Sequence, residues 1–597
     1  MKDFTGRLIG RGPVHFQASP EPEVYVGVSV LFRGYIANVA TLAEESRRRG
    51  ETLADATDGR LFAAAYRWWG EHLQAHVLGE YAIAVFDEPR SRLLLTHDAL
   101  GILPLFYRHG FRDLTFSSHL DDLARLAGTD ELDEEYIADY LTTCSVMGPR
   151  TPYVGVRRLA PGQSLCWANH TISLRKTWDI TRVEPVILDA DEDYEERFRV
   201  LLREAIDGAV QPGEKVWSEL SGGLDSSSLV SVAVHCGMRQ LEAVSVIYTA
   251  STTADERPWM KSVLRQYRLP WHTLDADASR PFSELPPGFC AEPLNALPNA
   301  ALLRRYNALA KSHGVDVILS GHGGDQVCCG GAPKPYYLAD LLPFHMGQIL
   351  RALHDWQLSD LERRSIVFHL LRFVIKPFIR YWTQRSFFAE QARLTPPWIH
   401  PRYLRRQGLN KRARFQAAPR CRSPGQQYFV ELIWRSGFSP ADDRDQPFAF
   451  RYPLFYRPLV EFMLAIPWEQ KIRPGLDRHL QRRALKGILP EPIRQRLDKR
   501  GPAEAETAGL RNGSPWTELL LNRPHVVERG YVDANLWREA VNRARFGGIA
   551  SMRHFLATAT LEVWLRRLAD LRRDGSPLTQ VRPEARRRES LGPDGAR

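Results

Sequence analysis

The chain has 597 residues, more than one ordinary hydrophobic core supports, so two domains are expected. Apolar residues make up 44% of the sequence and charged residues 25%, a composition typical of a soluble globular protein. The net charge of +10 comes from arginines dispersed along the chain, which favours an acidic small molecule or a peptide over nucleic acid as the partner.

The sequence shows no feature of an exported or membrane-spanning chain. No uninterrupted apolar span reaches membrane length, and the first residues, MKDFTGRLIGRGPVHF, lack the apolar centre of a signal peptide. The seven cysteines show no C-x-x-C spacing, which favours reduced thiols over a zinc site or a disulfide framework. We therefore expect a cytoplasmic protein with no membrane partner.

Short strand-like segments separated by turns fill the chain up to residue 186. A helix is expected near residues 58–73. This pattern predicts a β-rich layered domain over residues 1–186. The predicted strands are 23–32, 81–87, 92–98, 114–118 and 164–168.

The pattern then changes to alternating helices and strands, beginning with a helix whose start is crowded with acidic residues. Such alternation predicts a parallel sheet with crossover helices, which binds ligands beyond the carboxyl ends of its strands. We assign residues 187–575 to this second domain, mostly helical beyond residue 332, and expect a disordered tail over residues 576–597. The predicted strands are 215–220, 241–248, 271–274 and 315–320.

The stretch SGGLDSS, residues 221–227, follows the first of these strands and precedes a helix expected from about Ser226. It is not a Walker loop, because no lysine in the chain follows a glycine. Glycines expose backbone N–H groups, hydroxyls add donors and a helix amino end favours anions, so the loop predicts phosphate binding. The alternative is a glycine turn with Asp225 as a helix cap. The expected phosphate-binding residues are Ser221, Gly222, Gly223, Ser226 and Ser227.

A carboxylate repels phosphate, so Asp225 in this loop suggests a bridging Mg²⁺. Residues 315–331 form a second strand that runs into glycines, in SGHGGD, and carry Asp325. One Mg²⁺ keeps several waters and takes one or two protein carboxylates. We predict that Asp225 and Asp325 meet across the strand ends as its ligands, although Asp325 alone fits an ordinary turn equally well.

SGGLDSS resembles the pyrophosphate loop of the ATP-pyrophosphatase enzymes, which cleave ATP between its α and β phosphates. With ADERPWMKSV, SGHGGD, RYPLFYRPLVEFMLAIP and ILPEPIRQRLDKRGP, the order and spacing are similar to the asparagine synthetase B family over most of the chain. GYIAN, LGEYAIAVFD, HDALGILPLFY and LTFSS also resemble that family's amide-hydrolysing domain. The resemblance implies an α/β chain with an N-terminal glutamine-amidotransferase-like domain of αββα layers (Ntn type). A Rossmann-like ATP-pyrophosphatase synthetase domain with helical additions would follow.

The resemblance also implies roles for single residues. Val246, Ser320 and Gly321 would flank the nucleotide of ATP, and Lys499 would steady the charge that develops on the acyl oxygen. Taken alone, Lys499 beside Arg500 would be a solvated surface charge.

Two departures from the family bear on the nitrogen donor. The amide-hydrolysing domain needs a cysteine directly after the initiator methionine, where this sequence has Lys2, and its G-E-I-Y-N segment is reduced to GYIAN. Without a thiol nucleophile no ammonia is released from glutamine. The first domain is therefore expected to be a degenerate glutaminase-like scaffold.

The residue after S-G in the second loop is glutamate in asparagine synthetases and a tyrosine base in β-lactam synthetases. Here it is His322, which can accept a proton from an attacking α-ammonium group; the alternative is a histidine that only hydrogen-bonds the loop. His322, Gln326, the missing cysteine and the length together resemble the lasso peptide cyclases. These enzymes adenylate an aspartate or glutamate side chain of a precursor peptide. The peptide's N-terminal amine then displaces AMP to close an isopeptide (macrolactam) ring.

That resemblance implies a precursor peptide as substrate, with a leader-binding protein and a leader peptidase as partners. One alternative is a β-lactam-synthetase-like or asparagine-synthetase-like ligase that acts on a small molecule. A second is a non-catalytic scaffold of a peptide-processing complex, against which Asp225, Asp325 and Lys499 argue. A third, a tRNA-modifying pyrophosphatase, would need a concentrated basic face.

The stretch SIVFHLLRFVIKPFIRYW, residues 365–382, is both apolar and basic. We predict a packed helix that is broken at Pro377. A surface that lines a peptide pocket is the alternative. Membrane attachment is a less favoured interpretation, because the basic residues lie within the apolar run rather than at its ends.

Overall fold

The computed structural model describes most of the chain, and the predicted tail over residues 576–597 lies outside the described part. The described residues are 3–9, 15–51, 53, 57–111, 113–126, 131–144, 146, 148–250, 255–286, 288–293, 297–331, 334–359, 364–387, 395–408, 420–435, 446–497, 508–511, 514–549 and 551–573.

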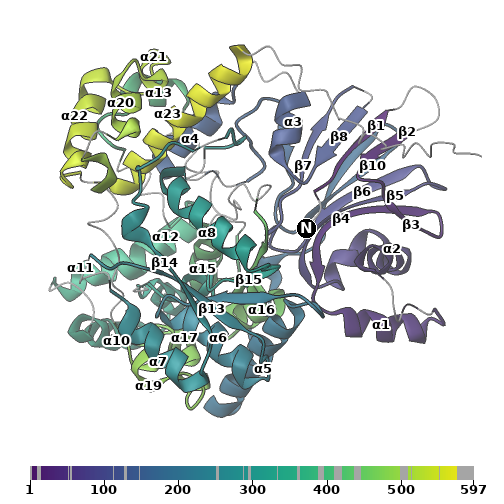
Figure 1. Ribbon diagram of the computed structural model, residues 1–597. Helices are drawn as coiled ribbons and strands as arrows, with labels where there is room; N and C mark the ends of the chain where they lie inside the picture. The colour runs from purple at the N-terminus through teal and green to yellow at the C-terminus, as the bar shows by residue number, and fades with distance from the viewer. Residues whose placement is uncertain are drawn as a thin grey trace, which may run out of the picture.

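Two antiparallel sheets pack face to face in the first domain, at the right of Figure 1. One sheet has the order β2-β1-β8-β7-β9, and the other the order β11-β10-β6-β5-β4-β3. Four of the five strands predicted here are confirmed within one or two residues at their ends. The fifth, 23–32, is wrong as a single strand, because the chain turns at Val26 and Gly27, both with positive φ, and forms the antiparallel pair β3 and β4. The strands are β1 (Thr5–Ile9), β2 (His15–Ser19), β3 (Glu23–Tyr25), β4 (Val28–Ile36), β5 (Gly79–Asp87), β6 (Arg92–His97), β7 (Phe106–His109), β8 (Asp113–Ser117), β9 (Val156–Arg158), β10 (Gln163–Ala168) and β11 (Thr171–Lys176).

Strand β5 shows why this domain is layered. Its sequence is apolar on both faces, because alternate side chains of a strand point to opposite sides of the sheet. Ala82, Ala84 and Phe86 pack between the two sheets, whereas Ile83 and Val85 pack under the helices on the outer face. These helices are α1 (Val39–Arg48), α2 (Asp58–Trp69) and the 3₁₀ turn η1 (Gly70–Ala75).

The second domain is built on a parallel five-stranded sheet with the order β14-β13-β12-β15-β16. The four predicted strands are confirmed as β12 (Val216–Glu219), β13 (Glu242–Ile247), β14 (Trp271–Asp275) and β15 (Val317–Leu319). The crossover helices are α6 (Leu224–His235), α7 (Arg257–Tyr267) and α8 (Ala300–Ser312), and α5 (Asp191–Gly208) precedes the first strand. Strand β16 (Ala449–Arg451) was not predicted, because it is three residues long and lies in a segment expected to be helical.

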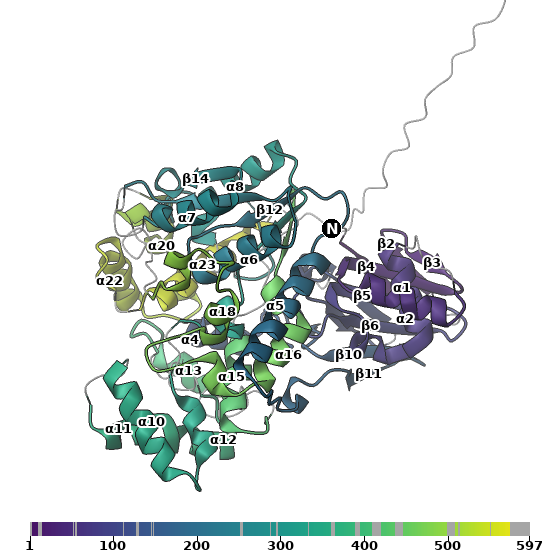
Figure 2. The same cartoon turned by 90° about the horizontal axis from the view of Figure 1, so that it is seen from below.

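The helical additions form two groups (Figures 1 and 2). One group, at the lower left of Figure 2, contains α10 (Met346–Ser359), α11 (Ile366–Leu370) and α12 (Lys376–Trp382). The other contains α13 (Pro401–Arg406), α20 (Pro515–Leu521), α21 (His525–Glu528), α22 (Ala534–Arg545) and α23 (Met552–Arg573). This second group shares one hydrophobic core with α4 (Glu134–Thr143) from the first part of the chain. Within the described residues no helix is long and apolar enough to cross a membrane.

A buried carboxyl group, that of Glu80, joins the two domains. Glu80 is 4% exposed at the start of β5, and its Oε1 accepts hydrogen bonds from the Tyr452 backbone N–H at 2.6 Å and the Tyr35 hydroxyl at 3.3 Å. Arg451, beside Tyr452, lies over the Tyr35 ring at 4.4 Å. Burial raises the pKa of Glu80 to about 8, and the nearby Asp98 adds to this rise.

The raised pKa of Glu80 predicts how stability depends on pH. The unfolded chain ionises Glu80 near its ordinary pKa of 4.5, whereas the folded chain keeps the proton up to about pH 8. The free energy of unfolding should therefore fall as pH rises from 5 to 8, by roughly 2–4 kcal/mol. Glu80→Gln mimics the protonated form, so this fall should vanish when thermal unfolding midpoints are compared across the range. The exposed Glu491→Gln is the control, and an unchanged slope in Glu80→Gln would contradict the buried proton.

Candidate active site

Two loops lie side by side at the carboxyl end of the parallel sheet. Strands β12 and β15 are neighbours, with Ser218 opposite Leu319, so the segments that follow them leave the sheet at the same edge. The first loop leads into α6, which begins at Leu224 rather than at the expected Ser226. The second leads into the short helix α9 (Gly324–Val327). The strand–loop–helix arrangement predicted for SGGLDSS is therefore present.

Glycines of the second loop allow the two loops to touch. A Cβ on Gly321 would lie 2.7 Å from the Ser226 nitrogen, which no backbone tolerates. A Cβ on Gly324 would collide with the Asp225 carboxyl group. The glycine-rich sequence SGHGGD is thus explained by close approach to the first loop.

The two predicted aspartates are brought together by an arginine. Arg478 Nη2 lies 2.7 Å from Asp225 Oδ2 and also contacts Asp325 Oδ1, while Nε donates to Asp225 Oδ1 at 2.9 Å. Arg478 is 7% exposed and has a left-handed backbone, with φ of 51°. Asp225 does not act as a helix cap, since it lies within the first turn of α6. Sequence reasoning missed Arg478, which no local motif distinguishes from the other arginines around it.

The remaining loop residues divide into surface and buried positions. Ser221 is exposed and its hydroxyl contacts that of Ser226 at 2.9 Å, while Gly222, with φ of 76°, turns the chain tightly. Gly223 N–H donates to Ser221 Oγ. Ser227 is fully buried in α6, away from the loop surface. Val246 lies half-buried in β13, the strand beside β12.

His322 is exposed at the rim of the second loop. The centroid of its ring lies 5.8 Å from the ring centroids of both Tyr452 and Phe455, in edge-on contacts. The backbone N–H of His322 donates to Ser320 Oγ at 3.3 Å. Desolvation against these neighbours lowers the pKa of His322, and the Asp325 carboxylate opposes this shift. The lowered pKa favours the neutral imidazole, which is the form that can accept a proton.

A half-buried glutamate at the end of β12, Glu219, supports the second loop and was also missed from the sequence. Glu219 Oε2 accepts a hydrogen bond from the Ser320 hydroxyl, and burial raises the pKa of Glu219. Ser320 N–H donates to the carbonyl of Arg451, the last residue of β16, at 2.9 Å. Ser320 is thereby held from both neighbouring strands.

A second buried ion pair braces the first loop. Arg496 binds Glu256 through two hydrogen bonds of 2.7 and 2.6 Å and donates to the Gly222 carbonyl at 3.0 Å. Its guanidinium stacks over the Trp259 ring at 3.9 Å. Lys499 follows three residues later and lies outside the described residues. Within the described part of the chain, no group of three or more histidine, cysteine, aspartate or glutamate side chains could hold a metal ion.

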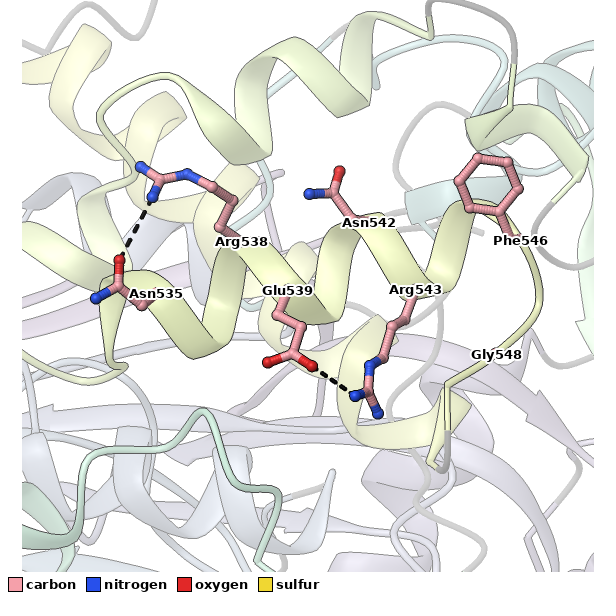
Figure 3. Close-up of a pocket in the computed structure, with 7 residues that line it drawn as sticks. All are labelled: Asn535, Arg538, Glu539, Asn542, Arg543, Phe546 and Gly548. Carbon is pink, nitrogen blue, oxygen red and sulfur yellow. Dashed lines mark hydrogen bonds and ion pairs between the residues drawn. The ribbon is translucent and has the colours of Figure 1, made fainter.

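Two surface hollows lie elsewhere. One, of about 550 Å³, lies along α22, and Figure 3 shows Arg543 pointing to Glu539 and Arg538 pointing to Asn535, so its polar groups pair with one another. The other, of about 620 Å³, lies between α5 and α16 (Arg457–Ala465). Neither hollow is lined by a predicted site residue.

Comparison with known proteins agrees with the two-domain architecture. A family model described as asparagine synthase matches residues 197–566, and a glutamine amidotransferase domain model matches residues 18–178. The chain belongs to the asparagine synthase family. It is therefore a member of a family of ATP-dependent, amide-forming ligases, and the predicted fold class is confirmed.

Individual relatives carry related names. The chain is 23% identical over 532 residues to glutamine-hydrolysing asparagine synthetase 3 of Bacillus subtilis, covering 85% of this chain and 80% of that protein. It is 28% identical over 233 residues to a putative glutamine-hydrolysing asparagine synthetase of Mycobacterium tuberculosis, covering 37% and 35%. Among solved structures, the glutamine-dependent NAD⁺ synthetase from Acinetobacter baumannii with bound ADP shares 12% identity over 66% of this chain and 95% of that one, with a TM-score of 0.20.

Removing the arginine that joins the aspartates tests this geometry. Arg478→Met leaves two carboxylates facing each other, so the free energy of unfolding should fall by roughly 2–4 kcal/mol. Asp225→Asn should cost clearly less in the Arg478→Met background than in the native chain, because its partner is already gone. Thermal unfolding of the single and double variants measures this coupling. Arg494→Met, which removes a partly exposed pair with Glu491, is the control, and strictly additive effects would contradict a direct pair.

Proposed function

We propose that the chain is a lasso peptide cyclase. It adenylates an aspartate or glutamate side chain of a precursor peptide with ATP, releasing pyrophosphate. The N-terminal amine of the same peptide then attacks the acyl carbon, so that AMP leaves and an isopeptide bond closes the ring. The observation that carries this proposal is the position of an accessible His322 beside the paired aspartates, where a base for an amine nucleophile is needed, and burial lowers the pKa of this histidine.

Features of the first domain support the proposal that the nucleophile is an amine other than ammonia released from glutamine. Its cysteines within the matched residues 18–178, Cys144 and Cys166, are 1% and 4% exposed, so neither thiol is accessible to glutamine. Asp98 accepts hydrogen bonds from three backbone N–H groups, of Leu100, Ile102 and Leu103, and is committed to its own turn. We infer that this domain is a scaffold that positions the synthetase loops.

The first half-reaction needs groups that hold ATP and its departing pyrophosphate. Ser221, Gly222 and Gly223 offer hydroxyl and backbone donors at the start of α6 for the phosphates. Asp225 and Asp325 fit Mg²⁺, because two carboxylate oxygens approach one nitrogen atom of Arg478 and hard oxygen ligands suit this ion. The ion would neutralise the phosphate charge when bound. Arg478 itself supplies a fixed positive charge at the same place.

In the second half-reaction His322 would accept the proton that the ammonium group loses as it becomes a nucleophile. Lys499 would stabilise the oxyanion of the tetrahedral intermediate. The role of Lys499 rests on the family motif alone. A leader-binding protein would present the precursor peptide to the enzyme, and a leader peptidase would remove the leader and free the N-terminal amine.

The role of His322 predicts a separation of the two half-reactions. His322→Ala should retain ATP–pyrophosphate exchange, because adenylation does not need the base. Amide formation should fall by about 10²–10⁴-fold. Since the pKa of His322 lies below the ordinary 6.5, the native amide-forming rate should decline only at pH values below this, and the variant should lack the decline. Equal losses in both half-reactions would assign His322 to loop structure alone.

A second substitution tests the lysine. Lys499→Ala should abolish ring closure while ATP still binds, as measured by nucleotide titration and by mass spectrometry of the peptide product. Lys486→Ala, which changes an exposed lysine earlier in the same segment, should leave both unchanged. An active Lys499→Ala enzyme would remove this residue from the mechanism.

A small-molecule ligase of the asparagine synthetase type is the second candidate, favoured by the names of the relatives. Purified chain is incubated with ATP and either a candidate precursor peptide or aspartate with ammonia or glutamine, and AMP and pyrophosphate are measured. Release that requires the peptide supports the cyclase. Release of AMP and pyrophosphate with aspartate and a nitrogen source, together with asparagine formation, would contradict the cyclase and support the small-molecule ligase.

A further inference from the structure

The apolar and basic stretch after residue 365 forms one continuous helical run at the edge of the molecule (Figure 2). It consists of α11, the π-helical turn η6 (Leu371–Ile375) and α12, and ends at Trp382. The helix was predicted to break at Pro377, and this is wrong. A proline clashes with the carbonyl four residues earlier, that of Phe373, and the wider π turn that contains Phe373 accommodates it.

One face of this run is anchored in the protein. Phe373, Val374 and Tyr381 are 2%, 0% and 8% exposed, and His369 is 1% exposed. Tyr381 donates a hydrogen bond to the Cys421 carbonyl at 2.8 Å. The orientation of the opposite face is therefore fixed.

That opposite face presents large apolar side chains to solvent. Nine of the eighteen large apolar residues that are exposed in the described part of the chain lie between Phe344 and Trp382, so exposure is concentrated in this helical group. On the run itself the exposed fractions are 60% for Val367, 39% for Phe368, 54% for Leu371, 54% for Ile379 and 57% for Trp382.

Basic side chains accompany this apolar row. Arg372 and Lys376 are exposed and lie at helical spacing from each other, next to Leu371 and Ile375 in the chain. The Arg364 and Arg372 guanidinium groups both lie over the Phe368 ring, at 5.9 and 5.7 Å. Residues 364–387 contain four arginines, one lysine and no acidic residue. The basic residues interrupt the apolar run in the sequence, but in the folded helix Arg372 and Lys376 lie along one side of the apolar row.

We propose that this apolar-basic face, formed by Val367, Phe368, Leu371, Arg372, Lys376, Ile379 and Trp382, binds the surface of an anionic lipid bilayer. Aromatic and aliphatic side chains on one rigid helical face suit the boundary between headgroups and acyl chains, and the flanking cations attract anionic lipids. A segment without acidic residues has no charge that the bilayer would repel. The chain would lie on the membrane rather than cross it. This attachment does not depend on the proposed reaction.

Vesicle co-sedimentation of the full chain tests the proposal. The chain should bind vesicles that contain about one third phosphatidylglycerol at least roughly tenfold more strongly than pure phosphatidylcholine vesicles, with weakening as salt rises. Leu371→Gln with Ile379→Gln removes apolar area, and Arg372→Gln with Lys376→Gln removes charge. Each pair should lower binding to the anionic vesicles roughly tenfold. All four side chains are exposed, and thermal unfolding verifies that the variants fold.

The control is Val154→Gln with Leu174→Gln, which removes two exposed apolar side chains from the first domain. Its binding should equal that of the native chain. No preference for anionic vesicles, or equal binding by the face variants and the native chain, would overturn the proposal. Failure to bind vesicles combined with capture by an acidic amphipathic partner through the same residues would overturn it in favour of a protein interface.

Discussion

The contact of one guanidinium with two aspartates on different loops is the interaction on which the site depends. Asp225 and Asp325 lie in the first turns of α6 and α9, the helices that follow two neighbouring parallel strands, so the fold places two negative charges together. Arg478 balances them from a segment that is 253 residues from Asp225 and 153 from Asp325. The glycines at 321 and 324 allow the approach, and the arginine makes it electrostatically acceptable.

The first domain takes part in this arrangement through contacts with the second loop and its neighbours. Glu80 binds the Tyr452 N–H, the Tyr452 ring meets His322, and the carbonyl of the preceding Arg451 accepts the N–H of Ser320. A domain that has no accessible thiol among its described residues therefore still fixes the loop that carries the candidate base. These contacts are the ones that the proposed scaffold role requires.

Local patterns predicted much of this structure, and long-range contacts account for what they missed. The periodicity of residues 215–248 and 315–320 was enough for the parallel strands, and SGGLDSS was enough for the first loop. Arg478, Arg496 and Glu219 were not found, because their role comes from neighbours supplied by distant segments. The short strand β16 has no period to detect. The place of Lys499 rests on family resemblance alone.

The charge of the site favours a cation that arrives with the nucleotide. Arg478 contacts a third carboxylate, that of Asp477, whose other oxygen binds Arg482. Among these five groups the carboxylates therefore outnumber the guanidinium groups by one. Adding the phosphates of ATP alone would increase this excess, whereas ATP with a divalent ion would reduce the repulsion on both sides. Arginine thus holds the loops together but does not offset the charge of phosphates, so the proposed Mg²⁺ would bind together with the nucleotide rather than before it.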